Sequence, residues 1–211
     1  MDWQNALENL LEVVYLPLKQ SRTEWLLVGS AATAVAGCDL TPGDLDILAR
    51  TPEGVRRFSE LLADYAPADC VYPPGHEKWQ SSRQMPVCVM GEGALSSIWH
   101  FGRWYIDGFK IEVAHIAPPA DATARSNGTG IWENGPEIWP YRVETTFKEF
   151  SFGTVPLEIQ LETNFSRGLS ARTAKIIKLF RQKGYDRELL LKSLSPDHLQ
   201  LFEQAFSNPL S

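Results

Sequence analysis

The residues with the clearest chemical potential are Asp44 and Asp46, two aspartates separated by one residue. The segment 44–49, DLDILA, alternates polar and apolar residues at its start, which predicts a strand. Side chains two residues apart on a strand point to the same face, with Cα atoms about 6.5 Å apart. Two carboxylates in this arrangement can hold Mg²⁺, with phosphate oxygens completing its coordination. An Asp-x-Asp alone is also common at the surface ends of strands, so its meaning depends on what precedes it.

A glycine and a serine, Gly29 and Ser30, precede the aspartates by a gap of 13 residues. The apolar run 25–28 predicts a buried strand that ends at Gly29, and the small residues 30–36 predict a short helix. Glycine permits a sharp turn and the close approach of a ligand. The Ser30 hydroxyl and the first N–H groups of a helix together offer a site for phosphate.

The joint pattern resembles the signature of the nucleotidyltransferase superfamily with the DNA polymerase β-like core. That signature is a hydrophobic residue, Gly, Gly or Ser, a gap of about nine to thirteen residues, and then two acidic residues around a hydrophobic one. The segments 28–30 and 44–47 match it at every position, with the gap at the long end.

The superfamily also has a third carboxylate on a later strand between hydrophobic residues, and Glu112 fits because it lies between Ile111 and Val113. An unpaired carboxylate in an apolar strand is costly, so Glu112 needs either a function or an ion pair, for example with Lys110. Asp107 is a competing third carboxylate, but the turn predicted at 107–108 explains it better.

The resemblance implies a reaction in which an acceptor hydroxyl attacks the α-phosphate of a nucleoside triphosphate and pyrophosphate leaves. It implies that Asp44 and Asp46 hold Mg²⁺ under the triphosphate, and that Asp46 and Glu112 hold the ion that activates the acceptor. Glu112 is also a candidate general base. Gly29 and Ser30 are expected to bind the β- and γ-phosphates.

The elements that must position these residues indicate an α+β fold, a mixed sheet with flanking helices of the nucleotidyltransferase type. We expect a core over residues 1–155 and a helical C-terminal appendage over 156–211. Expected strands lie at 25–28, 44–49, 87–90, 95–106, 109–116 and, as one strand, within 142–152. Expected helices lie at 3–15, 52–65, 157–166, 171–183, 186–193 and 196–206, and the proline-rich stretch 117–140 is expected to be a substrate-binding loop.

Charge is distributed unevenly along the 211 residues, whose formal net charge is -6. This acidity argues against a surface that binds nucleic acid throughout. The segment 167–185 nevertheless contains six bases and no acids. This basic helix could neutralise a triphosphate or bind an RNA acceptor, or it could be an ordinary solvated face. Lys175 is the best single candidate for a phosphate contact, and Ser166 and Arg167 are weaker ones.

Other features favour a cytoplasmic protein without a zinc site or a membrane segment. Three distant cysteines fit buried, reduced thiols, and the four histidines lack the spacing of zinc ligands. The N-terminus lacks the basic start and continuous apolar run of a signal peptide.

Several alternatives stay open at this stage. The acceptor hydroxyl could belong to a small molecule, a protein or an RNA, and the last option includes a toxin of a toxin–antitoxin pair that modifies tRNA. A non-catalytic nucleotide-binding or partner-binding module of the same fold is the main competing hypothesis. A hydrolase with a coincidental Asp-x-Asp is weaker, because no nucleophile and base pair is evident.

Overall fold

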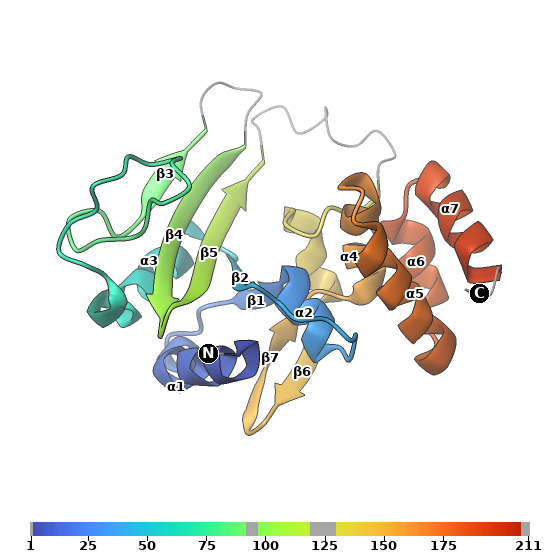
Figure 1. Ribbon diagram of the computed structural model, residues 1–211, viewed down its shortest axis with the longest axis horizontal. Coiled ribbons are helices and arrows are strands. Elements are labelled where there is room, and N and C mark those ends of the chain that lie inside the picture. Colours follow the sequence, from blue (N-terminus) through green and yellow to red (C-terminus); the bar gives the residue numbers. More distant parts are fainter. Residues whose placement is uncertain (1, 92–96, 119–129, 208–211) are drawn as a thin grey trace.

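A computed structural model describes residues 2–91, 97–118 and 130–207 of the chain. Within these ranges, seven strands form one mixed sheet in the order β3-β4-β5-β2-β1-β7-β6 (Figure 1). The strands are β1 (Trp25–Val28), β2 (Asp44–Ala49), β3 (Cys88–Met90), β4 (Ile98–Ile106), β5 (Phe109–Ala117), β6 (Val143–Phe147) and β7 (Phe150–Thr154). The pairs β2–β5 and β1–β7 are parallel and the other neighbours are antiparallel, so the expected α+β class is confirmed.

Helices α1 (Trp3–Gln20) and α3 (Pro52–Leu61) contribute to the main hydrophobic core with the sheet. Asp2 caps the N-terminus of α1, where its carboxylate accepts a hydrogen bond from the backbone N–H of Asn5. Thr51 caps the N-terminus of α3, where its hydroxyl accepts from the N–H of Gly54, and Pro52 occupies the first turn. Both helices therefore carry their own start signals and bury an apolar face against the strands.

The short helix α2 (Gly29–Val35) packs against β1, β2 and helix α4 (Leu157–Ser166). Its alanines permit this close approach, and Ala31 and Ala32 are completely buried. The Thr33 hydroxyl and the Gln160 side chain form a buried hydrogen bond between α2 and α4. The Gln160 amide also donates to the carbonyl of Val155, so this contact fixes the helical C-terminal region against the sheet.

The C-terminal helices α4, α5 (Ser170–Lys183), α6 (Arg187–Ser193) and α7 (Pro196–Ser207) gather on one side of the molecule, away from β3 and β4 (Figure 1). A second hydrophobic cluster, which includes Leu161, Ile176 and Phe202, holds them together. Two buried carboxylates of α4 bind the starts of the next helices, since Glu158 accepts from the N–H of Asp186 and Glu162 from that of Ser195. The helical C-terminal region is confirmed, whereas the division into units 1–155 and 156–211 stays a prediction.

The segment expected to hold one strand, 142–152, instead contributes β6 and β7 as an antiparallel hairpin. The two strands are joined at Lys148 and Glu149, and Lys148 adopts a left-handed backbone conformation with φ of 53°. A Lys-Glu pair lacks the residues that usually indicate a hairpin turn, so the reversal was not evident from the sequence.

Several boundaries also differ from expectation. Helix α1 continues to Gln20, beyond its expected end at residue 15. Strand β4 begins at Ile98, whereas residues 95–96 of its predicted start lie outside the described residues. In the expected loop 117–140, residues 119–129 also lie outside the described residues. Pro136–Tyr141, at the end of this loop, forms a 3₁₀ helix. After α3, Ala63–Tyr65 forms a separate 3₁₀ turn.

The thiols are free, but Cys70 is only half-buried, whereas Cys38 and Cys88 are buried as expected. Among the described residues, no helix combines the length and apolar character needed to cross a membrane.

Candidate active site

The three predicted carboxylates, Asp44, Asp46 and Glu112, lie together on neighbouring strands of the sheet. Strands β2 and β5 run parallel with Asp46 opposite Glu112, so side chains of the same face meet across the pair. One oxygen from each carboxylate lies within 4.8 Å of the others. The intervening Leu45 is completely buried in the core, which fixes the strand face that the aspartates occupy. We call these three residues the carboxylate cluster.

Gly29 lies directly against the carboxylate cluster. Strand β1 places Val28 opposite Asp46, and the chain then turns at Gly29 with φ of +64°. A Cβ atom at Gly29 would lie 2.5 Å from Oδ2 of Asp46. Both the left-handed conformation and the lack of space therefore require glycine at this position. Ser30 follows at the start of α2 and is mostly buried.

The cluster opens into a cavity of about 420 Å³. Gly29 and Ser30 line it beside the carboxylates, and Arg167 and Arg172 contribute guanidinium groups from the helical C-terminal region. Arg167 follows the last residue of α4, and Arg172 belongs to the first turn of α5. The cavity therefore combines carboxylates from the sheet with cations from the helices.

Two further cationic side chains hold the carboxylate cluster in place. The Lys110 ammonium lies between Asp44 and Glu112, 2.8 Å from Oδ2 of the former and 3.1 Å from Oε2 of the latter. Arg103 of β4, which pairs with Glu112 in the sheet register, donates from Nε to Glu112 Oε1 over 2.7 Å. Each side chain of these pairs is less than one-third exposed, so the contacts are shielded from solvent. The ion pair with Lys110 considered from the sequence is thus present, within the cluster.

Asp46 has the most perturbed environment of the cluster. Burial, followed by the charges of Asp44 and Glu112, raises its pKa, and Lys110 and Arg167 oppose the shift, with a net pKa of about 7. A carboxyl group with this pKa is partly protonated near neutral pH, and a cation that binds beside it favours its charged form. The oxygen donors suit Mg²⁺, and the Lys110 ammonium between two of them shows that the cluster already binds positive charge. Asp44, Asp46 and Glu112 could therefore hold a divalent ion.

Lys175, the predicted phosphate contact, does not line the cavity. It is exposed on α5, and its ammonium donates to the backbone carbonyl of Asp39. Arg172, three residues earlier, lines the cavity instead. Ser166 is exposed and also lies outside the lining, whereas Arg167 belongs to it.

Sequence reasoning missed one cavity residue completely, the buried Glu133. Burial, followed by the charge of Asp46, raises its pKa, and Arg167 and Arg172 oppose the shift, with a net pKa of about 7. Glu133 belongs to the segment between β5 and β6, outside any helix or strand. No periodic pattern marks such a residue, and the expectation of a functional loop at 117–140 was the only available signal.

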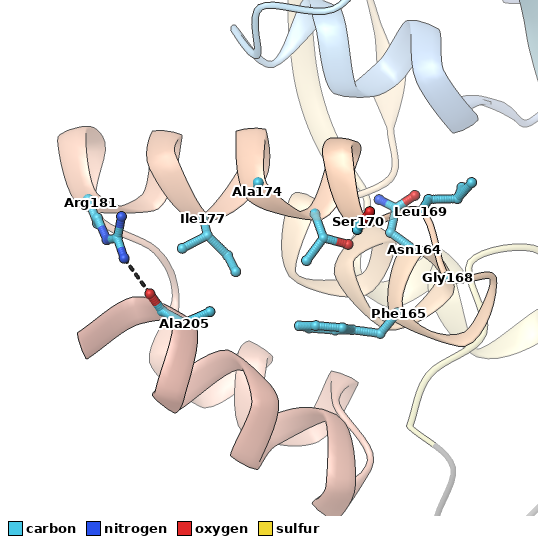
Figure 2. Close-up of a pocket in the computed structure, with 10 residues that line it drawn as sticks. Asn164, Phe165, Gly168, Leu169, Ser170, Ala174, Ile177, Arg181 and Ala205 are labelled. Carbon is cyan, nitrogen blue, oxygen red and sulfur yellow. Dashed lines mark hydrogen bonds between the residues drawn. The ribbon is translucent and has the colours of Figure 1, made fainter. Parts of the chain in front are cut away.

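A second cavity, of about 250 Å³, lies between the C-terminal helices and is mainly apolar. Figure 2 shows Phe165 of α4, Ile177 of α5 and Ala205 of α7 around it. Arg181 closes one end by donating to the carbonyl oxygen of Ala205. Its lining contains no carboxylate, thiol or imidazole, so it lacks the groups that the reaction would need.

No protein-family model matches the sequence, and no curated protein is significantly similar to it. The structure is similar to the crystal structure of a Thermotoga maritima protein that is provisionally described as a nucleotidyltransferase. The two share 17% sequence identity, with a TM-score of 0.50 over 87% of this chain and 97% of the other. At this identity the similarity concerns the fold. The chain therefore shares its fold with this protein, in agreement with the fold that the Gly-Ser and Asp-x-Asp residues led us to expect.

Proposed function

We propose that this chain is a metal-dependent nucleotidyltransferase, which moves a nucleoside monophosphate from a nucleoside triphosphate to an acceptor hydroxyl. The observation that carries the proposal is the meeting of Asp44, Asp46 and Glu112 beside Gly29, in a cavity that also presents guanidinium groups. Phosphoryl transfer needs this combination, because its transition state is stabilised mainly by cations and by positioning.

The roles proposed for the carboxylates are those that the resemblance implies, and the places of these residues in the sheet support them. Asp44 and Asp46, on β2 next to Gly29, would hold the Mg²⁺ ion that carries the triphosphate. Asp46 and Glu112 would hold the second ion, next to the acceptor. When bound, these ions neutralise charge on the phosphates and make the acceptor hydroxyl easier to deprotonate. Lys110 and Arg103 keep Asp44 and Glu112 in position before the ions arrive.

The triphosphate would lie between the sheet and the C-terminal helices. The Ser30 hydroxyl lies on the sheet side, and Arg167 and Arg172 lie on the helical side. Neither arginine forms an ion pair with another described residue, so both guanidinium groups are available for phosphate oxygens. In this proposal the two arginines take the place that sequence reasoning gave to Lys175.

The acceptor hydroxyl could belong to an RNA, a small molecule or a protein side chain. Lys175 and Lys178 are exposed and add positive charge to α5. This charge is compatible with an RNA acceptor, but a small molecule or a protein side chain would equally reach the carboxylate cluster through the open cavity.

The binding half of the proposal is tested by thermal unfolding with each of the four nucleoside triphosphates, with and without Mg²⁺. Wild type is compared with Asp46→Asn and with Asp64→Asn, a matched change at an exposed residue after α3. Each shift is measured against the same variant without ligand. A triphosphate at about 100 times its Kd should stabilise the protein by about 2.7 kcal/mol.

We expect at least one triphosphate to raise the unfolding temperature of wild type and of Asp64→Asn in the presence of Mg²⁺. This increase should be lost in Asp46→Asn. No shift with any of the four at millimolar concentration would contradict the proposal. An equal shift in Asp46→Asn would show that the carboxylate cluster is not the binding site.

A further inference from the structure

Glu133 is a buried carboxylate whose presence the roles above do not explain. Its side chain is 6% exposed and lines the same cavity as the carboxylate cluster. Within the described parts of the chain, it forms neither a hydrogen bond nor an ion pair. A buried carboxylate without a partner costs several kcal/mol in general, so a residue of this kind commonly has a task that involves a ligand.

The other carboxylates of the cavity either bind cationic side chains or are proposed metal ligands. Both oxygens of Glu112 are bound by cationic side chains, Oε1 by Arg103 and Oε2 by Lys110. Lys110 also binds Asp44. Asp46 lies opposite Glu112 in the sheet, and in the proposed function it would contribute to both metal positions. Glu133 is therefore the cavity carboxylate that is neither bound by a cationic side chain nor required as a metal ligand.

The charges around Glu133 come from three elements. Asp46 of β2 faces it with negative charge, and Arg167 after α4 and Arg172 of α5 face it with positive charge. Glu133 therefore lies in the cavity among the groups that would surround the reacting phosphate. A carboxylate placed in this way can accept a proton from a hydroxyl bound in the same cavity.

We propose that Glu133 is the general base of the transfer, the group that takes the proton of the acceptor hydroxyl. This inference rests on the proposed function. As the acceptor oxygen forms its bond to the α-phosphorus, its O–H proton passes to a carboxylate oxygen of Glu133. The bond between the α-phosphorus and the bridging oxygen breaks, and pyrophosphate leaves with the electron pair. Glu133 then returns the proton to solvent, and Glu112 keeps its role in metal binding.

The experiment separates binding from turnover in Glu133→Gln. The variant keeps the side-chain volume and removes the base, and Glu137→Gln is the matched control at an exposed residue four positions later. Glu133→Asp keeps a carboxylate and serves as a second test if the amide perturbs folding. Transfer is followed as incorporation of the label of an α-³²P-labelled triphosphate into an acceptor, with a small-metabolite extract and total RNA supplied as acceptors. Binding of the Mg²⁺–triphosphate is measured by thermal shift on the same proteins.

We expect Glu133→Gln to lower kcat at least 100-fold. Triphosphate affinity should change less than about threefold, because no phosphate contact is removed. Glu133→Asp should have intermediate activity, and Glu137→Gln should match wild type. A wild-type kcat in Glu133→Gln would overturn the inference, as would an equal loss of binding and turnover, which indicates a structural role. Binding without turnover in wild type would instead contradict the proposed function, and absence of both would do the same.

Discussion

Replacing Asp46 by asparagine should stabilise the metal-free protein at neutral and higher pH. Burial, together with the charges of Asp44 and Glu112, raises the pKa of Asp46 from 3.8 to about 7. The folded state thus binds this proton more tightly than the unfolded state does. The corresponding stability is fully present below pH 3.8 and is lost as the pH rises to about 7. Above that pH, the folded wild-type protein bears the cost of a buried, repelled charge.

The magnitude follows from the size of the shift. Each pKa unit corresponds to about 1.4 kcal/mol, so a shift from 3.8 to about 7 gives at most about 4 kcal/mol at pH 8. Relaxation of the neighbouring carboxylates reduces this, and we expect an observed gain of about 2 to 4 kcal/mol. At pH 4 the aspartate is protonated in the folded wild type, so the difference between the variants should nearly vanish.

The assay is urea unfolding in EDTA at pH 4, 6 and 8, followed by fluorescence of the seven tryptophans. The exposed-site variant Asp64→Asn should differ from wild type by less than about 0.5 kcal/mol at every pH. Adding Mg²⁺ at pH 8 should reduce the difference in unfolding free energy between Asp46→Asn and wild type, because the ion stabilises wild type but not Asp46→Asn. If Asp46→Asn is no more stable than wild type at pH 8 without metal, the reasoning about the carboxylate cluster is refuted.

Three further predictions follow from the same geometry. Gly29→Ala should lower the unfolding free energy by about 1 to 2 kcal/mol and reduce Mg²⁺–triphosphate affinity more than tenfold, because the alanine Cβ would displace the Asp46 carboxylate. A wild-type affinity of this variant, measured by calorimetry, would refute this prediction. Arg172→Gln should lower triphosphate affinity about tenfold while Lys175→Gln changes it less than twofold, because Arg172 lines the cavity and Lys175 does not. A larger effect of Lys175→Gln than of Arg172→Gln would reverse this assignment. Leu161→Ala should lower the unfolding free energy by about 2 to 5 kcal/mol, because Leu161 is fully buried between the C-terminal helices; a loss below 1 kcal/mol in urea unfolding would contradict that packing.

The part of the site nearest the motif could be predicted from the sequence because its geometry is local. The strands at Trp25–Val28 and Asp44–Ala49 have the bounds expected from their apolar runs. Strand alternation alone places Asp44 and Asp46 on one face, and the hydrophobic neighbours of Glu112 indicate a buried strand. Their convergence also needs the parallel pairing of β2 with β5, which depends on residues far apart in the chain. For this step, the resemblance to a known superfamily supplied what local patterns could not.

The helical side of the cavity could not be predicted in the same way. Which base of the 167–185 segment faces the carboxylates depends on how α5 docks onto the sheet. That docking depends on long-range contacts, such as the one between Thr33 and Gln160. The charge pattern correctly indicated a basic helix, but Lys175 and Arg172 are indistinguishable by spacing alone.

Glu133 illustrates a different limit of sequence reasoning. It lies in an irregular segment, so neither helical nor strand periodicity predicts its direction or its burial. Its importance emerges only when the fold places it in the same cavity as the carboxylate cluster. Glutamates outside regular elements are ordinarily exposed, and the low exposure of Glu133 is the property that distinguishes it.

The central claim is tested most directly by following the position of the label during turnover. Wild type and Asp46→Asn are incubated with Mg²⁺, the acceptor fractions and the same triphosphate labelled with ³²P at either the α- or the γ-phosphate. The account predicts that wild type transfers the α-label to a new product and releases the γ-label as pyrophosphate. Asp46→Asn should show neither activity. Transfer of the γ-label, release of inorganic phosphate, or full activity of Asp46→Asn would contradict it.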